Sequence, residues 1–121
     1  GGCSHGPENT FAAFDHAAAR GIRWIETDIR ISADDHLVLI HDDELARTTN
    51  GRGSVRDLTL DQLKKLDAGS YVPQYPHDWR SSYGTRLAQP KLVTLDELFL
   101  RYKDAFHYVI DTKTPDGRSL L

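Results

Sequence analysis

Apolar residues recur along the chain with two different periods, and these periods predict which segments are helices and which are strands. Near the start, Phe11, Phe14 and Ala18 lie three and four positions apart, which is typical of a helix with one apolar face. The pair Asn9-Thr10 can cap the start of this helix, and Gly21 is placed to end it in the left-handed conformation. We therefore expect an N-terminal helix that packs through its apolar face.

The next apolar segment, residues 22–31, changes to a period of two, which predicts a strand. Its two faces differ in chemistry because successive side chains point to opposite sides. One face carries Ile25, Thr27, Ile29 and Ile31, and the other carries Glu26, Asp28 and Arg30. Residues 32–35 have the composition of a turn. The second strand, residues 37–40, is apolar throughout, which predicts burial on both of its faces.

Two capping boxes predict helices in the second half of the chain. In each of them a threonine stands three positions before a glutamine or a glutamate, so that each side chain can bond the backbone of the other. Thr59 pairs in this way with Gln62, and Thr94 with Glu97. The first helix is short and the second is expected to end near residue 103. A long proline-bracketed loop, residues 73–90, separates them and is typical of a functional loop or an insertion.

The last predicted strand, residues 106–110, ends at the polar residues Asp111-Thr112-Lys113. The elements therefore follow the order helix, strand, strand, helix, helix, strand. Helices that alternate with apolar strands predict an α/β protein with a largely parallel sheet. Polar residues follow the ends of two strands, His41 after the second and Asp111 and Lys113 after the third. In α/β folds this edge of the sheet binds ligands.

Composition and charge limit the class of protein. Of the 121 residues, 39% are hydrophobic and 27% charged, as in an ordinary soluble domain, which excludes a disordered tail and more than one normal domain. The formal net charge of -3 gives no basic footprint, so no nucleic-acid partner is expected. The longest aliphatic run, residues 37–40, falls far short of the ~20 residues that span a bilayer, so we expect no transmembrane segment.

Two residue counts change this picture. The chain contains no methionine, so we expect a processed product or a fragment. Its one cysteine, Cys3, cannot form an internal disulfide and leaves the compartment open, with a soluble cytoplasmic protein favoured.

Glu26 and Asp28 are the first candidate for chemistry. Residues two apart on a strand point to the same side, so these two carboxylates converge. Two like charges held together either raise a pKa or take up a cation. Carboxylate oxygens suit Mg²⁺ or Ca²⁺ better than zinc or copper. The alternative is a solvent-facing strand side that carries two ordinary acids.

The strand ends supply the other candidates. The imidazole of His41 can transfer a proton near neutral pH, and the alternative is a histidine that is only hydrogen-bonded at a strand end. Asp111 and Lys113 put an acid and a base on one face, and the alternative is an ion pair beside a turn. The other histidines carry weaker signals, although His5 could border a site; they are His5, His16, His36, His77 and His107.

Five blocks of sequence resemble the glycerophosphodiester phosphodiesterase family, in the family's order and at family-like gaps. They are Pro7-Glu8-Asn9-Thr10 followed by Ala12-Ala13-Phe14, then Ile25-Glu26-Thr27-Asp28, then His41-Asp42, then residues 47–55 (RTTNGRGSV), and then residues 58–69 (LTLDQLKKLDAG). The resemblance extends from Gly1 to Lys113.

This resemblance implies a TIM-type (β/α)₈ barrel that cleaves a phosphodiester with a divalent cation, Ca²⁺ or Mg²⁺, and two histidines. In the family, acids at the positions of Glu26, Asp28 and Asp111 bind the metal. His41 matches the second catalytic histidine, and Lys113 matches a lysine that faces the phosphate. The implied reaction converts a small-molecule glycerophosphodiester or lysophospholipid to glycerol 3-phosphate and an alcohol, in lipid and glycerol metabolism.

The chain departs from the family's pattern in three respects. Counting back from Pro7, the glycine of the family's His-Arg-Gly motif falls on Gly1, so the first catalytic histidine is expected before this chain begins. Asp111 replaces the usual glutamate and is one methylene shorter, so the metal must lie closer or a water must bridge. A barrel of this kind needs ~250 residues. We therefore expect residues 1–121 to be an inactive fragment of a single phosphodiesterase domain, roughly its first half without the first strand.

Two alternatives of the same ancestry stay open. A sphingomyelinase D-like or lysophospholipase D-like enzyme is favoured only by Asp111, because that branch uses aspartate there. A catalytically dead barrel that only binds metal or ligand is the other.

Overall fold

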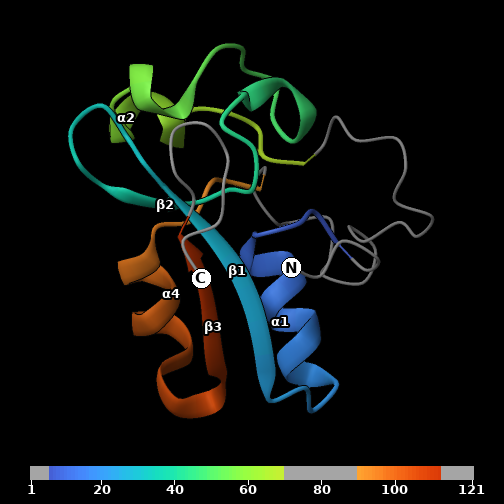
Figure 1. The fold of residues 1–121 in the computed structure, drawn as a ribbon. Coiled ribbons are helices and arrows are strands. Elements are labelled where there is room, and N and C mark those ends of the chain that lie inside the picture. Colours follow the sequence, from blue (N-terminus) through green and yellow to red (C-terminus); the bar gives the residue numbers. More distant parts are fainter. Residues whose placement is uncertain (1–5, 70–89, 113–121) are drawn as a thin grey trace.

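The computed structural model describes residues 6–69 and 90–112, which form one sheet with helices packed against it (Figure 1). In chain order the elements are α1 (Phe11–Ala19), β1 (Trp24–Ile31), β2 (Leu37–Leu39), α2 (Leu60–Lys64), α4 (Leu95–Tyr102) and β3 (His107–Thr112). Short 3₁₀ helices lie at Leu45–Arg47, Val55–Asp57 and Lys103–Ala105. The expectations for Cys3, His5, His77, Lys113 and the loop between 73 and 89 fall outside the described residues.

The three described strands lie in the order β2-β1-β3. β1 and β3 are parallel, as predicted, with α4 on the path between them. The expectation of a largely parallel sheet is wrong for β2, which pairs antiparallel with β1. The physical reason is the length of the connection, because a parallel pair needs a crossover of a dozen or more residues. Here a tight turn joins the strands, closed by the amide of Ser32 donating to the carbonyl of His36.

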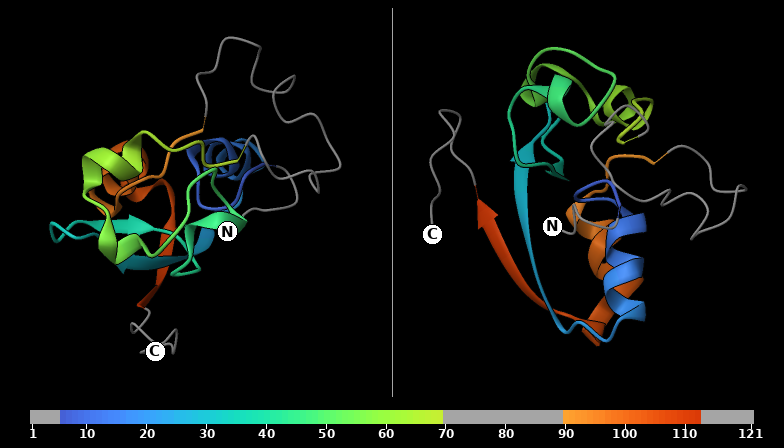
Figure 2. Two further views of the ribbon diagram at one scale, coloured as in Figure 1. Left: turned by 90° about the horizontal axis from the view of Figure 1, so that it is seen from above. Right: turned by 90° about the vertical axis from the view of Figure 1, so that its right-hand side faces the viewer.

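The main core lies between the sheet and the two longer helices. Figure 2 shows α1 and α4 on the same side of β1 and β3, so one face of the sheet is covered and the other is not covered by these helices. Buried side chains of α1, β1 and α4 meet there, together with one residue of β2, one residue just before α4 and one just before β3. They are Phe14, Ala17, Ile25, Ile29, Leu39, Val93, Leu98, Tyr102 and Phe106. A second cluster supports the segment after β2 and comprises Val38, Ile40, Leu45, Val55, Leu63, Ala68 and Leu92.

The predicted helix ends are confirmed where local chemistry sets them. Thr59 and Thr94 both form the reciprocal capping box, with Gln62 and Glu97 respectively. Gly21 ends the first helical segment with a φ of 75°, a conformation that costs a glycine nothing. The N-terminal cap of α1 differs from expectation, because the Thr10 hydroxyl donates to the carbonyl of Pro7 instead of capping the helix.

Burial corrects two details of the predicted core. α1 packs through Ala13, Phe14 and Ala17, whereas Ala18 is exposed, because the buried face is rotated toward the sheet. β2 is not buried throughout, because Leu37 is 38% exposed. Leu37 is the first residue of β2 and lies next to the turn of the hairpin. None of the helices in the described ranges combines the length and the apolar character needed to cross a membrane.

Leu98 tests this core. Leu98→Ala is expected to lower the free energy of unfolding by about 2–5 kcal/mol, because the side chain is fully buried between α4 and the sheet and its removal leaves a cavity. Leu100→Ala is the matched control on the same helix, and its side chain is 73% exposed. We expect the control to change stability by less than about 0.5 kcal/mol. Urea unfolding of the complete gene product measures both, and equal losses would contradict this packing.

Candidate metal centre

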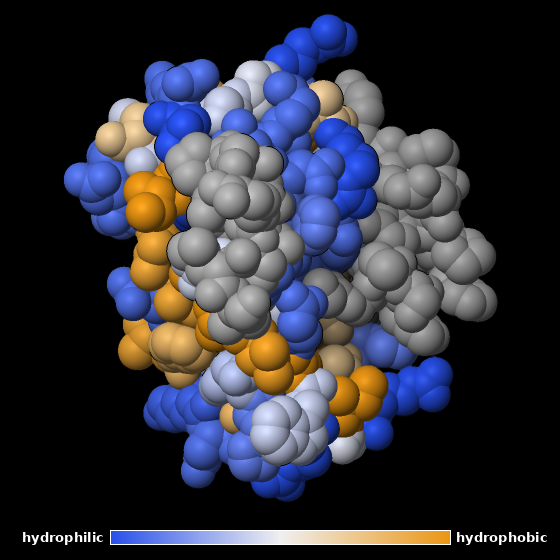
Figure 3. Space-filling view, viewed as in Figure 1, coloured by the Kyte–Doolittle hydropathy of each residue, from blue (hydrophilic) through white to orange (hydrophobic). Residues whose placement is uncertain are grey.

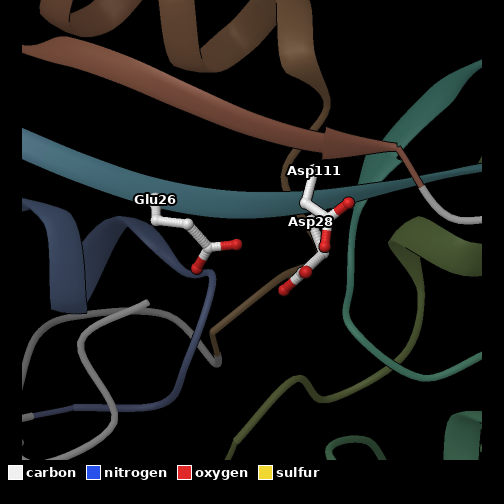
Figure 4. Close-up of side chains that lie close together, drawn as sticks. All are labelled: Glu26, Asp28 and Asp111. Atoms are coloured by element: carbon white, nitrogen blue, oxygen red, sulfur yellow. The ribbon is translucent and has the colours of Figure 1, made fainter. Parts of the chain in front are cut away.

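Three carboxylates converge at one end of the parallel strand pair. Glu26 and Asp28 lie two residues apart on β1, and Asp28 is the register partner of Asp111 on β3. Each residue offers one carboxylate oxygen, and these oxygens all lie within 4.8 Å of one another. Figure 4 shows the three side chains pointing away from the strands toward one shared region. The sequence predicted the first pair from its period of two, and the parallel register brings the third carboxylate to it.

The strand pattern places this cluster on the face that α1 and α4 leave uncovered. Ile25 and Ile29 point into the main core, so the alternate positions of β1 point the other way. On that face the upstream end is apolar and aromatic, with the Trp24 and His107 rings 4.6 Å apart. The carboxylates follow at the downstream end. Figure 3 shows apolar and polar surface lying next to each other on the side of the molecule seen in Figure 1.

The donor set fits a hard divalent cation. Metal–oxygen bonds of about 2.0–2.6 Å allow two oxygens on opposite sides of one ion to lie about 4–5 Å apart, and no two of these three oxygens are farther apart than 4.8 Å. Exposed acids gather on many surfaces without binding anything. Asp28 is different, because it is only 5% exposed and has two carboxylates close to it, an arrangement of like charges that a cation would relieve.

His41 lies two residues after the end of β2, beside the strand that carries two of these acids. The amide of Ile40 donates to the carbonyl of Asp28 across 3.1 Å, and Arg30 Nε donates to the carbonyl of His41 across 2.8 Å. The two contacts tie the backbone of Ile40 and of His41 to β1. The imidazole itself is 53% exposed. Its Nδ1 lies 2.7 Å from Asp42 Oδ1.

The loop after His41 is held by its own acids. Asp43 accepts from the Ser54 hydroxyl at 2.7 and 2.8 Å, and Glu44 Oε1 accepts from the amide of Gly53 at 2.9 Å. Asp42 takes a different partner, the guanidinium of Arg47, at 2.7 and 3.1 Å. This hydrogen bond from Arg47 lowers the pKa of Asp42, against a smaller rise from burial, so the carboxyl is ionised near neutral pH.

Arg47 also reaches the segment before α1. Its Nη2 lies 2.5 Å from Glu8 Oε1, and the Glu8 side chain is only 16% exposed. Next to it, the Thr27 hydroxyl of β1 donates to Asn9 Oδ1 across 2.8 Å. Sequence reasoning gave Glu8, Asp42 and Arg47 no role. The adjacency of His41 and Asp42 was a visible signal, but nothing in the sequence connects Arg47 with Glu8.

The remaining candidates are placed away from the carboxylates or lie outside the described residues. His36 is at the opposite end of β2, where Nε2 lies 3.7 Å from Asp34. His16 accepts from Arg20 Nε on α1, and His107 is at the upstream end of β3. Lys113 directly follows the last described residue, so its predicted role stays a prediction.

Comparison with known proteins gives the family. The model of the glycerophosphoryl diester phosphodiesterase family matches residues 1–119. The glycerophosphodiester phosphodiesterase of Bacillus subtilis (strain 168) is 38% identical over 117 residues, which are 96% of this chain and 39% of that protein. The enzyme of the same name from Caldanaerobacter subterraneus subsp. tengcongensis is 44% identical over 93 residues, 77% of this chain and 34% of that protein.

Solved structures agree in fold. The glycerophosphodiester phosphodiesterase of Agrobacterium tumefaciens superposes with a TM-score of 0.73 at 35% identity, over 90% of this chain and 42% of that one. An Oleispira antarctica phosphodiesterase, solved with the product sn-glycerol-3-phosphate, gives a TM-score of 0.78 at 34% identity, over 97% of this chain and 43% of that one.

These comparisons confirm the predicted fold class. The described residues are an α/β part of the (β/α)₈ barrel of these phosphodiesterases. The chain spans about two-fifths of the length of the Bacillus relative and of both solved structures. With the family model matched over nearly all of its residues, the chain belongs to the glycerophosphoryl diester phosphodiesterase family.

Proposed function

We propose that the complete gene product carrying this chain hydrolyses glycerophosphodiesters to glycerol 3-phosphate and an alcohol with the help of a divalent cation. The observation that carries the proposal is the meeting of Glu26, Asp28 and Asp111 in a chain of this family. The Oleispira phosphodiesterase, solved with sn-glycerol-3-phosphate, supports the product class. Residues 1–121 are proposed to be part of a single phosphodiesterase domain.

Each candidate residue has a distinct task in this proposal. Glu26, Asp28 and Asp111 would hold Mg²⁺ or Ca²⁺, and the bound ion would supply positive charge for a phosphate oxygen. His41 would hold or move a proton at Nε2, the ring nitrogen that does not face Asp42. Lys113 would add positive charge where negative charge develops on the phosphate.

The three carboxylates would also fix the position of the ion, without themselves touching the bond that is cleaved. They lie on two neighbouring strands whose register is fixed by six residue pairs, so their relative positions are set by the sheet rather than by a loop. A site built on strands holds its geometry better than one built on loops.

Cation removal tests the proposal. The complete gene product, dialysed against a chelator, is expected to lose turnover of glycerophosphocholine by about 10²-fold or more, because a polarising ion supplies several kcal/mol and each 1.36 kcal/mol is worth tenfold. Adding back Mg²⁺ or Ca²⁺ separately identifies the ion. Phosphorus NMR should show glycerol 3-phosphate as the product.

Three results would contradict the proposal. They are turnover that is unchanged by the chelator, a product in which the phosphate stays on choline, and the absence of turnover in the ion-loaded protein. Lysophosphatidylcholine serves as the second substrate, because Asp111 in place of glutamate is the one residue that favours a phospholipase D-like reaction. Faster turnover of the lysophospholipid than of glycerophosphocholine would favour that branch.

A further inference from the structure

The surroundings of His41 contain a connected series of charged groups that the proposed reaction does not itself require. The series runs from the imidazole to Asp42, from Asp42 to Arg47 and from Arg47 to Glu8. Its members come from two segments far apart in sequence, the loop after β2 and the residues before α1.

We propose that Asp42, held by Arg47 and Glu8, is a positioning residue that fixes the orientation and the tautomer of the His41 ring, so that Nε2 is the nitrogen presented to substrate. The inference rests on the proposed role of His41. The inference explains in addition how an exposed imidazole ring keeps one orientation and one tautomer.

The first argument concerns orientation. An imidazole that is 53% exposed can turn about its side-chain bonds unless a partner holds it. Asp42 provides that partner, with its Oδ1 2.7 Å from Nδ1. Asp42 is itself fixed because Arg47 binds both of its oxygens, Nε to Oδ2 and Nη2 to Oδ1. A two-point contact between a guanidinium and a carboxylate sets the plane of the carboxylate as well as its position.

The second argument concerns the proton. An ionised carboxylate can only accept hydrogen bonds, so the contact at Nδ1 requires the ring to carry a proton there. The hydrogen bonds from Arg47 favour this ionised form, because they lower the pKa of Asp42. In the neutral ring, Nε2 is then left without a proton and can accept one. The network therefore selects one of two tautomers.

The third argument concerns the frame to which the ring is tied. Glu8 directly precedes Asn9, whose side chain accepts from Thr27 of β1. Arg30, also on β1, holds the carbonyl of His41. The backbone and the side chain of His41 are thus both tied to the strand that carries Glu26 and Asp28. A shift of the loop that moved the ring relative to the carboxylates would have to break contacts at both ends.

The test combines NMR with kinetics on the complete gene product. In protein labelled with ¹⁵N-histidine, the His41 signals are assigned by their loss in His41→Gln. We expect the wild type to show a protonated Nδ1 and an unprotonated Nε2. Asp42→Asn should reverse or mix this state, because a carboxamide can offer its NH₂ group to Nδ1. The same variant should lower kcat by about 10²-fold or more with little change in KM.

Asp43→Asn is the matched control, because the neighbouring carboxylate binds the Ser54 hydroxyl and does not contact the ring. We expect it to leave both the tautomer and kcat as in the wild type. Arg47→Lys keeps the charge but loses the two-point contact, so it should lower kcat less than Asp42→Asn does.

Two results would overturn the proposal in an active protein: Asp42→Asn keeping the wild-type tautomer, or keeping the wild-type kcat. An equal effect of Asp43→Asn would also overturn it, since that would indicate a general disturbance of the loop. Failure of the proposed function gives a different result, a wild type that does not turn over glycerophosphodiesters with its ion bound. The two failures are therefore distinguishable.

Discussion

Replacing Asp28 by asparagine is expected to lower turnover of glycerophosphodiesters about 10²–10⁴-fold. Asp28 is the most buried of the three carboxylates and the register partner of Asp111, so it lies at the centre of the candidate metal site. Asparagine keeps the size of the side chain and removes one negative charge. Because this charge is lost, the apparent affinity for Mg²⁺ or Ca²⁺, measured by titrating the ion and following turnover, should also fall.

A second measurement separates loss of the ion from loss of the fold. An ion that binds only the native state raises the unfolding temperature. We expect this rise in the wild type and little of it in Asp28→Asn. Without the ion, the variant should be at least as stable as the wild type, because one of three mutually repelling charges is gone.

Asp61→Asn is the control for this prediction, because Asp61 is an exposed acid in the first turn of α2. It should change neither turnover nor ion dependence. An Asp28→Asn protein that retained wild-type turnover and the same ion dependence would remove these carboxylates from the reaction.

Replacing His41 by glutamine is expected to lower kcat about 10²–10⁴-fold, the range that general acid–base groups contribute. Glutamine can hydrogen-bond to Asp42 but cannot exchange a proton near neutral pH. Ion affinity should stay close to that of the wild type, because His41 is not among the three clustered carboxylates. Kinetics at saturating ion, together with the ion titration, measure the two quantities separately.

His36→Gln is the matched control for His41→Gln. The two histidines flank β2 at its opposite ends, and both side chains are about half exposed. We expect His36→Gln to keep wild-type turnover. Comparable losses in the two variants, or wild-type kcat in His41→Gln, would contradict a specific role for His41.

Local rules made most of the fold predictable. The capping boxes at Thr59 and Thr94 and the left-handed Gly21 act within a few residues, so the sequence alone shows them. The alternation along β1 likewise placed Glu26 and Asp28 on one face before any tertiary information. The side of the sheet that the helices cover follows from the same alternation, because Ile25 and Ile29 need an apolar partner.

Two features were not predicted, one set by a short local connection and the other by a contact between distant segments. The connection between β1 and β2 is too short for a parallel crossover, so the antiparallel pairing of β2 could have been predicted from its length. The apolar run in β2 indicates burial, but it does not distinguish a parallel strand from an antiparallel one. The contact between Arg47 and Glu8 has no such local sign. It requires the loop after β2 to fold back onto the segment before α1, and only the tertiary structure brings these segments together.

The pairing of Asp28 with Asp111 across two parallel strands has a consequence for folding errors. Side chains alternate along a strand, so sliding β3 by one residue would turn Asp111 to the opposite face of the sheet. A cation bound between the two strands would stabilise only the correct alignment. The same ion that assists the chemistry would thus favour the correct strand alignment during folding. Misaligned chains would bind the ion weakly and would not gain this stabilisation.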